Sequence, residues 1–208
     1  MNLKSFLKTQ PMLVALRQRY EFILWKLSGQ KGGAPHLYKQ IIIRQFTKRY
    51  NMPVLVESGT YLGDMVYAMC SRFEKIYSIE LAQDLFIRAV KRFQNYSHIV
   101  ILEGDSGKVF ANLIPTLNQS AIFWLDGHYS GGETARAEQD TPVMAEVKTI
   151  LQQMKQPFVI LIDDARLFVG QNGYPTLEEL KAYLSNANIK LDIKVEKDII
   201  QIYPNLNV

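Results

Sequence analysis

The stretch VLVESGTYLGD, residues 54–64, joins an apolar run, a turn with two glycines and the start of a helical pattern. Val54–Val56 is a short, uninterrupted apolar run, as in strands that are buried on both faces. Gly59 and Gly63 follow it, and residues 64–72 have helical spacing. This order of strand, glycine turn and helix predicts the first unit of a parallel α/β sheet.

Strand and helix patterns keep alternating along the rest of the chain. Further strands are predicted at residues 75–79, 99–102, 121–125 and 158–162, with helices near residues 83–95, 106–114 and 143–154. The sequence Thr176–Glu179 (TLEE) is a capping box that opens one more helix, to about Ser185. The last two predicted strands, residues 190–195 and 199–203, are joined by too few residues for a parallel crossover, so they must be antiparallel. We therefore expect a Rossmann-like, mostly parallel seven-stranded sheet with an antiparallel final strand and helices on both faces.

The first 50 residues differ from the rest in charge and in pattern. They predict two helices, over about residues 1–28 and 36–50, joined by the helix-breaking linker GQKGGAP. We divide the chain into a helical cap, residues 1–50, and an α/β domain, residues 51–208. The cap has ten Lys and Arg against one acid, Glu21, a net charge of +9, whereas the remainder has −5. This asymmetry favours an anionic partner for the cap, such as a membrane surface or a substrate, although a solvated helix face is an equal alternative.

The overall composition is that of a soluble globular protein. Of the 208 residues, 48% are hydrophobic and 21% charged, and the longest uncharged apolar runs are far shorter than the roughly 20 residues of a membrane-spanning helix. Cys70 is the only cysteine, so no internal disulfide can form. We expect a cytoplasmic protein without a signal peptide, and no nucleic acid as partner, because no binding module for it is recognisable.

Acidic residues stand at the carboxyl end of every predicted parallel strand. They are Glu57, Glu80, Asp105, Asp126 and the pair Asp163–Asp164. In a parallel sheet these ends share one edge, which is where open α/β folds bind ligands. Single acids there also begin turns or cap helices, but all five strands together predict an edge that binds a cation.

The glycine loop restricts the type of ligand. A dinucleotide fingerprint starting at Gly59 would need glycine at positions 61 and 64, where this chain has Tyr61 and Asp64. An anion at the start of a helix disfavours a bound pyrophosphate. Glu80, 17 residues after Gly63, stands where a ribose-binding carboxylate is expected. A positively charged nucleoside such as S-adenosylmethionine fits this loop, the alternative being a turn with no ligand.

The ordered set of segments resembles the class I S-adenosylmethionine-dependent methyltransferases. It is most similar to the divalent-metal-dependent O-methyltransferases typified by catechol O-methyltransferase. The segments that carry the resemblance span about residues 54–168 and are VLVESGTYLGD, IYSIELAQDLFIRA, ILEGDSGKVF, IFWLDGH and VILIDDA.

The resemblance implies a cofactor pocket at the ends of the first three strands, formed by Glu57, Gly59, Thr60, Tyr61, Gly63, Glu80, Asp105 and Ser106. Within it, Glu57 would lie at the methionine end, Glu80 at the ribose hydroxyls and Asp105 beside the adenine.

The resemblance also implies that Asp126, Asp163 and Asp164 hold Mg²⁺ or another divalent cation, for which hard oxygen ligands are suited. The related enzymes usually have an acid followed by an amide where this chain has Asp163–Asp164. Either the second aspartate adds charge to the site, or Asp163 alone binds the metal and Asp164 caps the next segment.

The predicted catalytic base departs from the family pattern. The catechol-type enzymes have a lysine three residues after the strand-four aspartate, and here that position is Tyr129. The neighbouring His128 has a suitable unperturbed pKa, so we predict His128 as base beside the metal ligand Asp126, with Tyr129 second. Residues 130–141 have the pattern of a mobile lid, and Arg136 or Arg166 is a candidate clamp for an anionic substrate.

These features predict O-methyl transfer to a hydroxyl of a small molecule or sugar, with a divalent metal orienting the acceptor. One alternative is a non-catalytic S-adenosylmethionine-binding module. The other is a related metal-dependent enzyme such as a hydroxylase. Transition-metal oxygenases generally bind their metal through histidines beside one carboxylate, and the chain has only three histidines, His36, His98 and His128, so this alternative is disfavoured. The sequence does not identify the acceptor or the oligomeric state.

Overall fold

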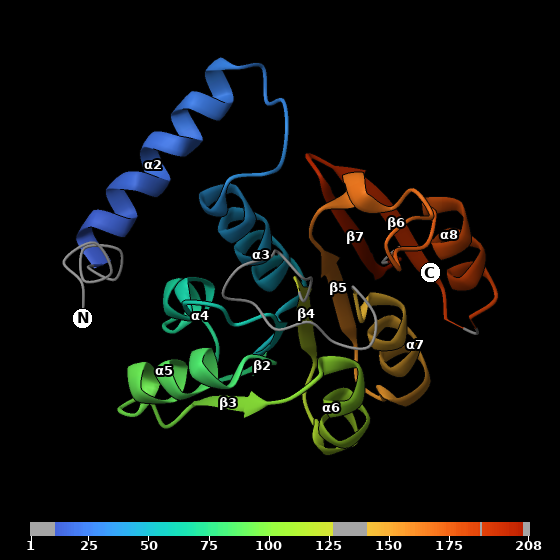
Figure 1. The fold of residues 1–208 in the computed structure, drawn as a ribbon. Coiled ribbons are helices and arrows are strands. Elements are labelled where there is room, and N and C mark those ends of the chain that lie inside the picture. The colour runs from blue at the N-terminus through green and yellow to red at the C-terminus, as the bar shows by residue number, and fades with distance from the viewer. Residues whose placement is uncertain (1–10, 127–140, 188, 206–208) are drawn as a thin grey trace.

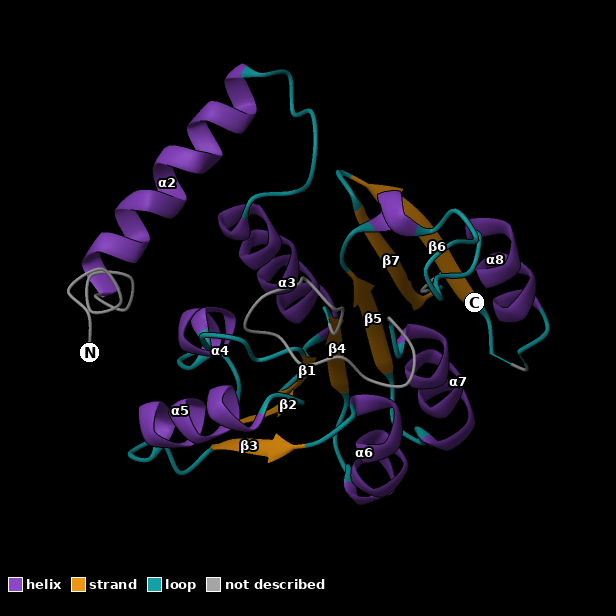
Figure 2. Ribbon diagram, viewed as in Figure 1, coloured by secondary structure: helices purple, strands orange, loops and turns teal. Residues whose placement is uncertain are grey.

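The computed structural model describes residues 11–126, 141–187 and 189–205. Its sheet has seven strands in the order β3-β2-β1-β4-β5-β7-β6 (Figures 1 and 2). The strands are β1 (Val54–Ser58), β2 (Lys75–Glu80), β3 (Ile99–Glu103), β4 (Ala121–Leu125), β5 (Phe158–Ile162), β6 (Leu191–Glu196) and β7 (Ile199–Pro204). Strands β1 to β5 pair in parallel, and β7 is antiparallel to both β5 and β6. The predicted sheet, with its antiparallel ending, is confirmed.

Helices cover both faces of this sheet. The elements are α3 (His36–Tyr50), α4 (Asp64–Met69) and α5 (Gln83–Phe93) on one face, and α6 (Ser106–Leu113), α7 (Val143–Gln153) and α8 (Leu177–Ser185) on the other. Short 3-10 turns, η1 (Ile114–Thr116) and η2 (Ala165–Leu167), follow α6 and β5. Alternate strand residues enter opposite cores: Val54 and Val56 pack on the α6–α8 side, and Leu55 on the α3–α5 side.

The register of the central strands decides which side chains meet at the carboxyl edge. Leu125 of β4 lies opposite Ile162 of β5, so Asp126 and Asp163 leave the sheet side by side. The Asp163 N–H still donates to the Leu125 carbonyl, at 3.0 Å, so the ladder extends to this point. Because alternate residues share a face, both aspartates lie on the face covered by α3.

The two N-terminal helices have different environments. Helix α3 is part of the core, where Ile42, Ile43 and Phe46 are buried against the sheet. Helix α2 (Pro11–Leu27) projects from the body and contacts α3 (Figure 1). No helix among the described residues is both long enough and apolar enough to cross a membrane.

Differences from the predicted elements are confined to their ends. Helix α4 stops at Met69, three residues before the predicted end at residue 72. Strands β1 and β2 run through Ser58 and Glu80, so Glu57 and Glu80 belong to strands rather than to the loops after them. The capping box is confirmed, because Thr176 and Glu179 each accept a hydrogen bond from the other's backbone N–H. Boundaries depend on local hydrogen bonds that an apolar pattern does not encode.

Candidate functional site

Most of the strand-end acids converge on one side of the carboxyl edge. Glu57, Glu80 and Asp163 are buried there, and Asp126 is partly exposed. Asp105 has a local structural role as well, since its side chain accepts a hydrogen bond from the Gly107 N–H, at 2.9 Å, and caps α6. Its predicted place beside the adenine stays a prediction.

The glycine loop is held tightly against the end of β2. The N–H groups of Gly59 and Thr60 donate to the Ile79 carbonyl at 3.0 and 3.2 Å. The Thr60 hydroxyl, which is buried, lies 2.6 Å from the Ser78 hydroxyl. Gly63 has a φ of +76°, and a Cβ there would come within 2.7 Å of the Phe93 ring. Glycine is therefore required at position 63 for backbone conformation and for packing on α5.

The carboxylate of Glu80 is oriented by the loop that it faces. The Tyr61 N–H donates to its Oε2 at 2.7 Å, and the Ala82 N–H donates to its Oε1 at 2.9 Å. A carboxylate has about four lone-pair positions, so both oxygens can accept further hydrogen bonds, as two ribose hydroxyls would require. The Tyr61 side chain is 50% exposed.

Glu57 is a buried acid beside this loop. The Ser78 hydroxyl donates to its Oε2, but burial raises its pKa to about 8, and the nearby carboxylates of Asp126, Glu80 and Asp64 add to the increase. Desolvation of the charged form is the main cause. A cation bound at this position would favour the ionised carboxylate.

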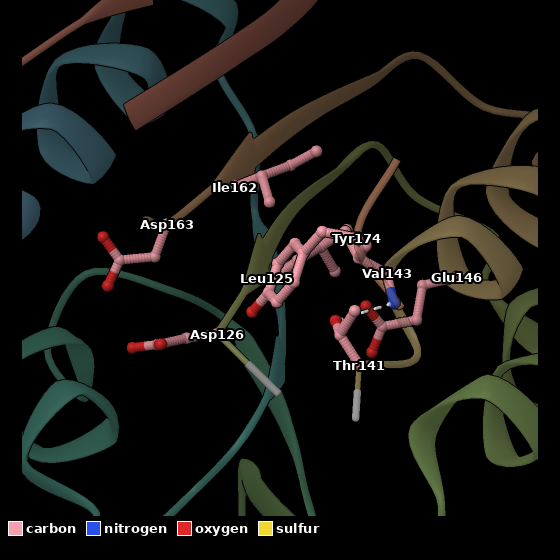
Figure 3. Close-up of a pocket in the computed structure, with 8 residues that line it drawn as sticks. All are labelled: Leu125, Asp126, Thr141, Val143, Glu146, Ile162, Asp163 and Tyr174. Atoms are coloured by element: carbon pink, nitrogen blue, oxygen red, sulfur yellow. Dashed lines mark hydrogen bonds between the residues drawn. The ribbon is translucent and has the colours of Figure 1, made fainter. Parts of the chain in front are cut away.

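Asp126, Asp163 and Asp164 form the predicted acidic cluster. One carboxylate oxygen from each lies within 4.8 Å of the others, which is compatible with a shared cation. Figure 3 shows the Asp126 and Asp163 carboxylates directed to the same side of the strands. The Oδ1 atom of Asp163 is buried and has no hydrogen-bond partner among the described residues. Three carboxylates, one of which has this unsatisfied oxygen, fit a divalent ion such as Mg²⁺.

The structure corrects one interpretation of Asp164. It occupies the position before η2 with a φ of +56°, but its side chain makes no capping hydrogen bond there. Its Oδ1 instead accepts from Arg166, at 2.7 Å. Arg166 also pairs with Asp198, so this predicted substrate clamp is already engaged with two carboxylates.

Sequence reasoning missed a lysine in the cluster. The Lys39 ammonium, delivered by α3, forms an ion pair with Oδ2 of Asp163. Burial lowers the pKa of Lys39, but Asp126, Asp163 and Asp164 outweigh this effect, so the net pKa is raised and the ammonium stays charged. For Asp163, burial and the Asp126 carboxylate raise the pKa, and Lys39 opposes them. The sequence feature that could have indicated Lys39 is its helical spacing with Ile42, Ile43 and Phe46, which places it on the buried face of α3.

Glu146 of α7 is a second residue that the sequence did not indicate. It is buried in a small pocket that also includes Asp126, Thr141 and Tyr174 (Figure 3). Burial raises its pKa to about 7, against the influence of the Ser106 and Ser58 hydroxyls. Its place at buried helical spacing with Val143, Val147 and Ile150 was the only local signal.

Several predicted residues lie outside the described part of the chain. They are His128, Tyr129, Arg136 and the lid residues 130–140. Their predicted roles as base, clamp and lid therefore stay predictions. Among the described residues, the candidate metal cluster consists of the carboxylates of Asp126, Asp163 and Asp164.

Solved methyltransferase structures have the same fold as this chain. No protein-family model and no curated protein matches the sequence. A putative caffeoyl-CoA O-methyltransferase from Staphylococcus aureus aligns with a TM-score of 0.61 and 12% identity, over 91% of this chain and 100% of that one. The O-methyltransferase TomG from Streptomyces achromogenes, in complex with SAM, gives 0.59 and 9%, over 90% and 89%. The SAH-bound methyltransferase PaMTH1 from Podospora anserina gives 0.58 and 17%, over 80% and 78%. At these identities the likeness establishes the fold.

Proposed function

We propose that this chain, which has the fold of these methyltransferase structures, is an S-adenosylmethionine-dependent O-methyltransferase that acts on a hydroxyl of a small molecule or sugar. The observation that carries the proposal is the convergence of buried carboxylates on the ligand-binding edge of the sheet, beside a loop unsuited to pyrophosphate. Two of these structures have SAM or SAH bound. Such a ligand joins a ribose to an amino acid that carries an ammonium group, so an acid at the ribose position and another at the amino-acid position would suit it.

Each acid has a distinct task in this proposal. Glu80, already fixed by the Tyr61 and Ala82 N–H groups, accepts hydrogen bonds from the ribose hydroxyls. Glu57 faces the methionine end, where the positive charge of the bound cofactor would favour the ionised carboxylate. When bound, the cofactor supplies a methyl group on a positively charged sulfur.

The acceptor end of the site is assigned to Asp126, Asp163 and Asp164, which would hold a divalent cation. A bound cation there supplies Lewis acidity that makes an acceptor hydroxyl easier to deprotonate. The three side chains set its position relative to Glu57, because neighbouring strands in fixed register carry Glu57 and Asp126.

Calorimetry with S-adenosylhomocysteine tests the proposal. We expect the wild-type chain to bind, and Glu80→Ala to abolish the binding. Glu103→Ala is the matched control, because Glu103 lies opposite Glu80 in the β2–β3 register but is exposed. Absence of binding by the wild type, or unchanged binding by Glu80→Ala, contradicts the proposal.

A methyl-transfer assay on the same protein preparation distinguishes an enzyme from a non-catalytic binding module. Such a module would bind S-adenosylhomocysteine and depend on Glu80, but it would transfer no methyl group from S-adenosylmethionine to any of a panel of hydroxylated acceptors. Fold alone does not decide between the two.

We also propose an anionic partner for the basic N-terminal region, with a lipid surface as the leading case. Helix α2 exposes large apolar side chains together with Arg19 and Lys26. Apolar and basic groups on one exposed helix are the combination that binds anionic membrane surfaces.

A further inference from the structure

The acidic cluster contains its own cations. Lys39 pairs with Asp163, and Arg166 pairs with Asp164. The side chain of Asp163 is 1% exposed and that of Lys39 is 17% exposed, so this ion pair is largely shielded from solvent. Lysine and aspartate are rarely buried without such a partner.

The position of Lys39 follows from how α3 docks. Ile42, Ile43 and Phe46 fix the helix to the sheet, and Lys39 lies one turn before them on the same face. The helix therefore aims the ammonium at the carboxyl edge of the sheet. Because part of the Lys39 side chain is accessible, its flexible four-carbon stem allows the ammonium to move away from Asp163 toward solvent.

The two oxygens of Asp163 differ in their partners. Lys39 contacts Oδ2, while Oδ1 is buried with no hydrogen-bond partner among the described residues, and Asp163 belongs to the cluster that could bind a cation. A divalent ion on these oxygens would face the ammonium at short range, and two cations in a buried site repel strongly. The ion and the ammonium would therefore compete for the Asp163 carboxylate.

We propose that Lys39 is a built-in competitor for the divalent cation: it neutralises Asp163 when no metal is bound, and it must leave Asp163 for the metal to bind. Lys39 is thus a residue that sets metal affinity. This inference rests on the proposed cation site, but it does not depend on methyl transfer.

Titration of Mn²⁺ and Mg²⁺ into the full chain tests the proposal. Lys39→Met keeps the apolar stem and removes the charge, and we expect it to bind either metal on the order of 10-fold more tightly than the wild type. Lys39→Arg keeps the charge and should not gain affinity. Lys48→Met, an exposed lysine on the same helix, should bind as the wild type does. Equal or weaker binding by Lys39→Met overturns the proposal.

A measurement on the wild type covers the case in which Lys39→Met does not fold. Amine acetylation followed by mass spectrometry reports the accessibility of each lysine. We expect saturating Mn²⁺ to increase the labelling of Lys39 and to leave Lys48 unchanged. Unchanged or reduced labelling of Lys39 overturns the proposal. If neither the wild type nor Lys39→Met binds metal, the cation site and this inference both fail, while S-adenosylhomocysteine binding is an independent result.

Discussion

The Ser78 hydroxyl joins the glycine loop to a buried acid: it donates to Oε2 of Glu57 and lies 2.6 Å from the Thr60 hydroxyl. Glu57 and Ser78 are direct partners in the β1–β2 register, so neighbouring strands place them together. The loop is therefore linked by hydrogen bonds to a titratable residue inside the sheet.

Glu57 should make cofactor binding depend on pH. Its pKa of about 8 means that it binds a proton at neutral pH, and attraction to the ammonium group of S-adenosylhomocysteine requires the ionised form. We expect the affinity for S-adenosylhomocysteine to rise from pH 6 to pH 8, by at most about tenfold per pH unit. In calorimetry, Glu57→Gln should remove this slope, and Glu103→Gln should keep it. A wild-type affinity that does not change with pH would contradict the prediction.

Glu146 should make the folded state less stable at high pH. The unfolded chain releases this proton near the ordinary pKa of 4.5, whereas the folded chain holds it until about 7. Stability is therefore lost as pH rises between these values, by about 3 kcal/mol for this shift. Urea unfolding at pH 4.5 and pH 8 should show that Glu146→Gln gains stability relative to the wild type at the higher pH. The exposed Glu178→Gln serves as control, and an equal response of both variants would refute the assignment.

Asp126 should be essential for metal binding and for activity. We expect a chelator to remove methyl transfer, and added Mg²⁺ to restore it. Asp126→Asn should weaken Mn²⁺ binding about 10-fold or more, because it removes one charged ligand. Asp84→Asn, at an exposed position on α5, should behave as the wild type. Chelator-insensitive transfer is the result that would exclude a metal role.

Gly63 should be more sensitive to substitution than another glycine of the same conformation. Gly29 has a φ of +75° with no atom near its missing Cβ, whereas Gly63 has a φ of +76° and the Phe93 ring at 2.7 Å. Gly29→Ala should cost about 1 kcal/mol of left-handed strain, and Gly63→Ala about 2 kcal/mol more from the clash. Denaturant unfolding measures both, and equal costs would mean that Phe93 moves aside freely.

The N-terminal region should bind anionic vesicles. We expect cosedimentation with phosphatidylserine-containing vesicles, less at high salt, and none with pure phosphatidylcholine. Arg19→Gln with Lys26→Gln should weaken binding by about 2 kcal/mol. Lys155→Gln with Lys181→Gln, at two exposed positions of the α/β domain, should leave vesicle binding unchanged. Equal binding to neutral vesicles would assign the effect to apolar contact alone.

The amino-acid sequence by itself determined the sheet, its antiparallel ending and the edge where the acids gather. These features follow from short-range patterns, because an apolar run followed by Glu57, Asp126 or Asp163 specifies both a buried strand and a charged end. The tertiary structure alone decided which groups meet at that edge. Lys39 and Asp163 are 124 residues apart, and their contact arises from the docking of α3 on the sheet through buried side chains. Burial of Glu146 depends likewise on packing between α7 and the sheet, and packing of this kind is a long-range property that no local pattern encodes.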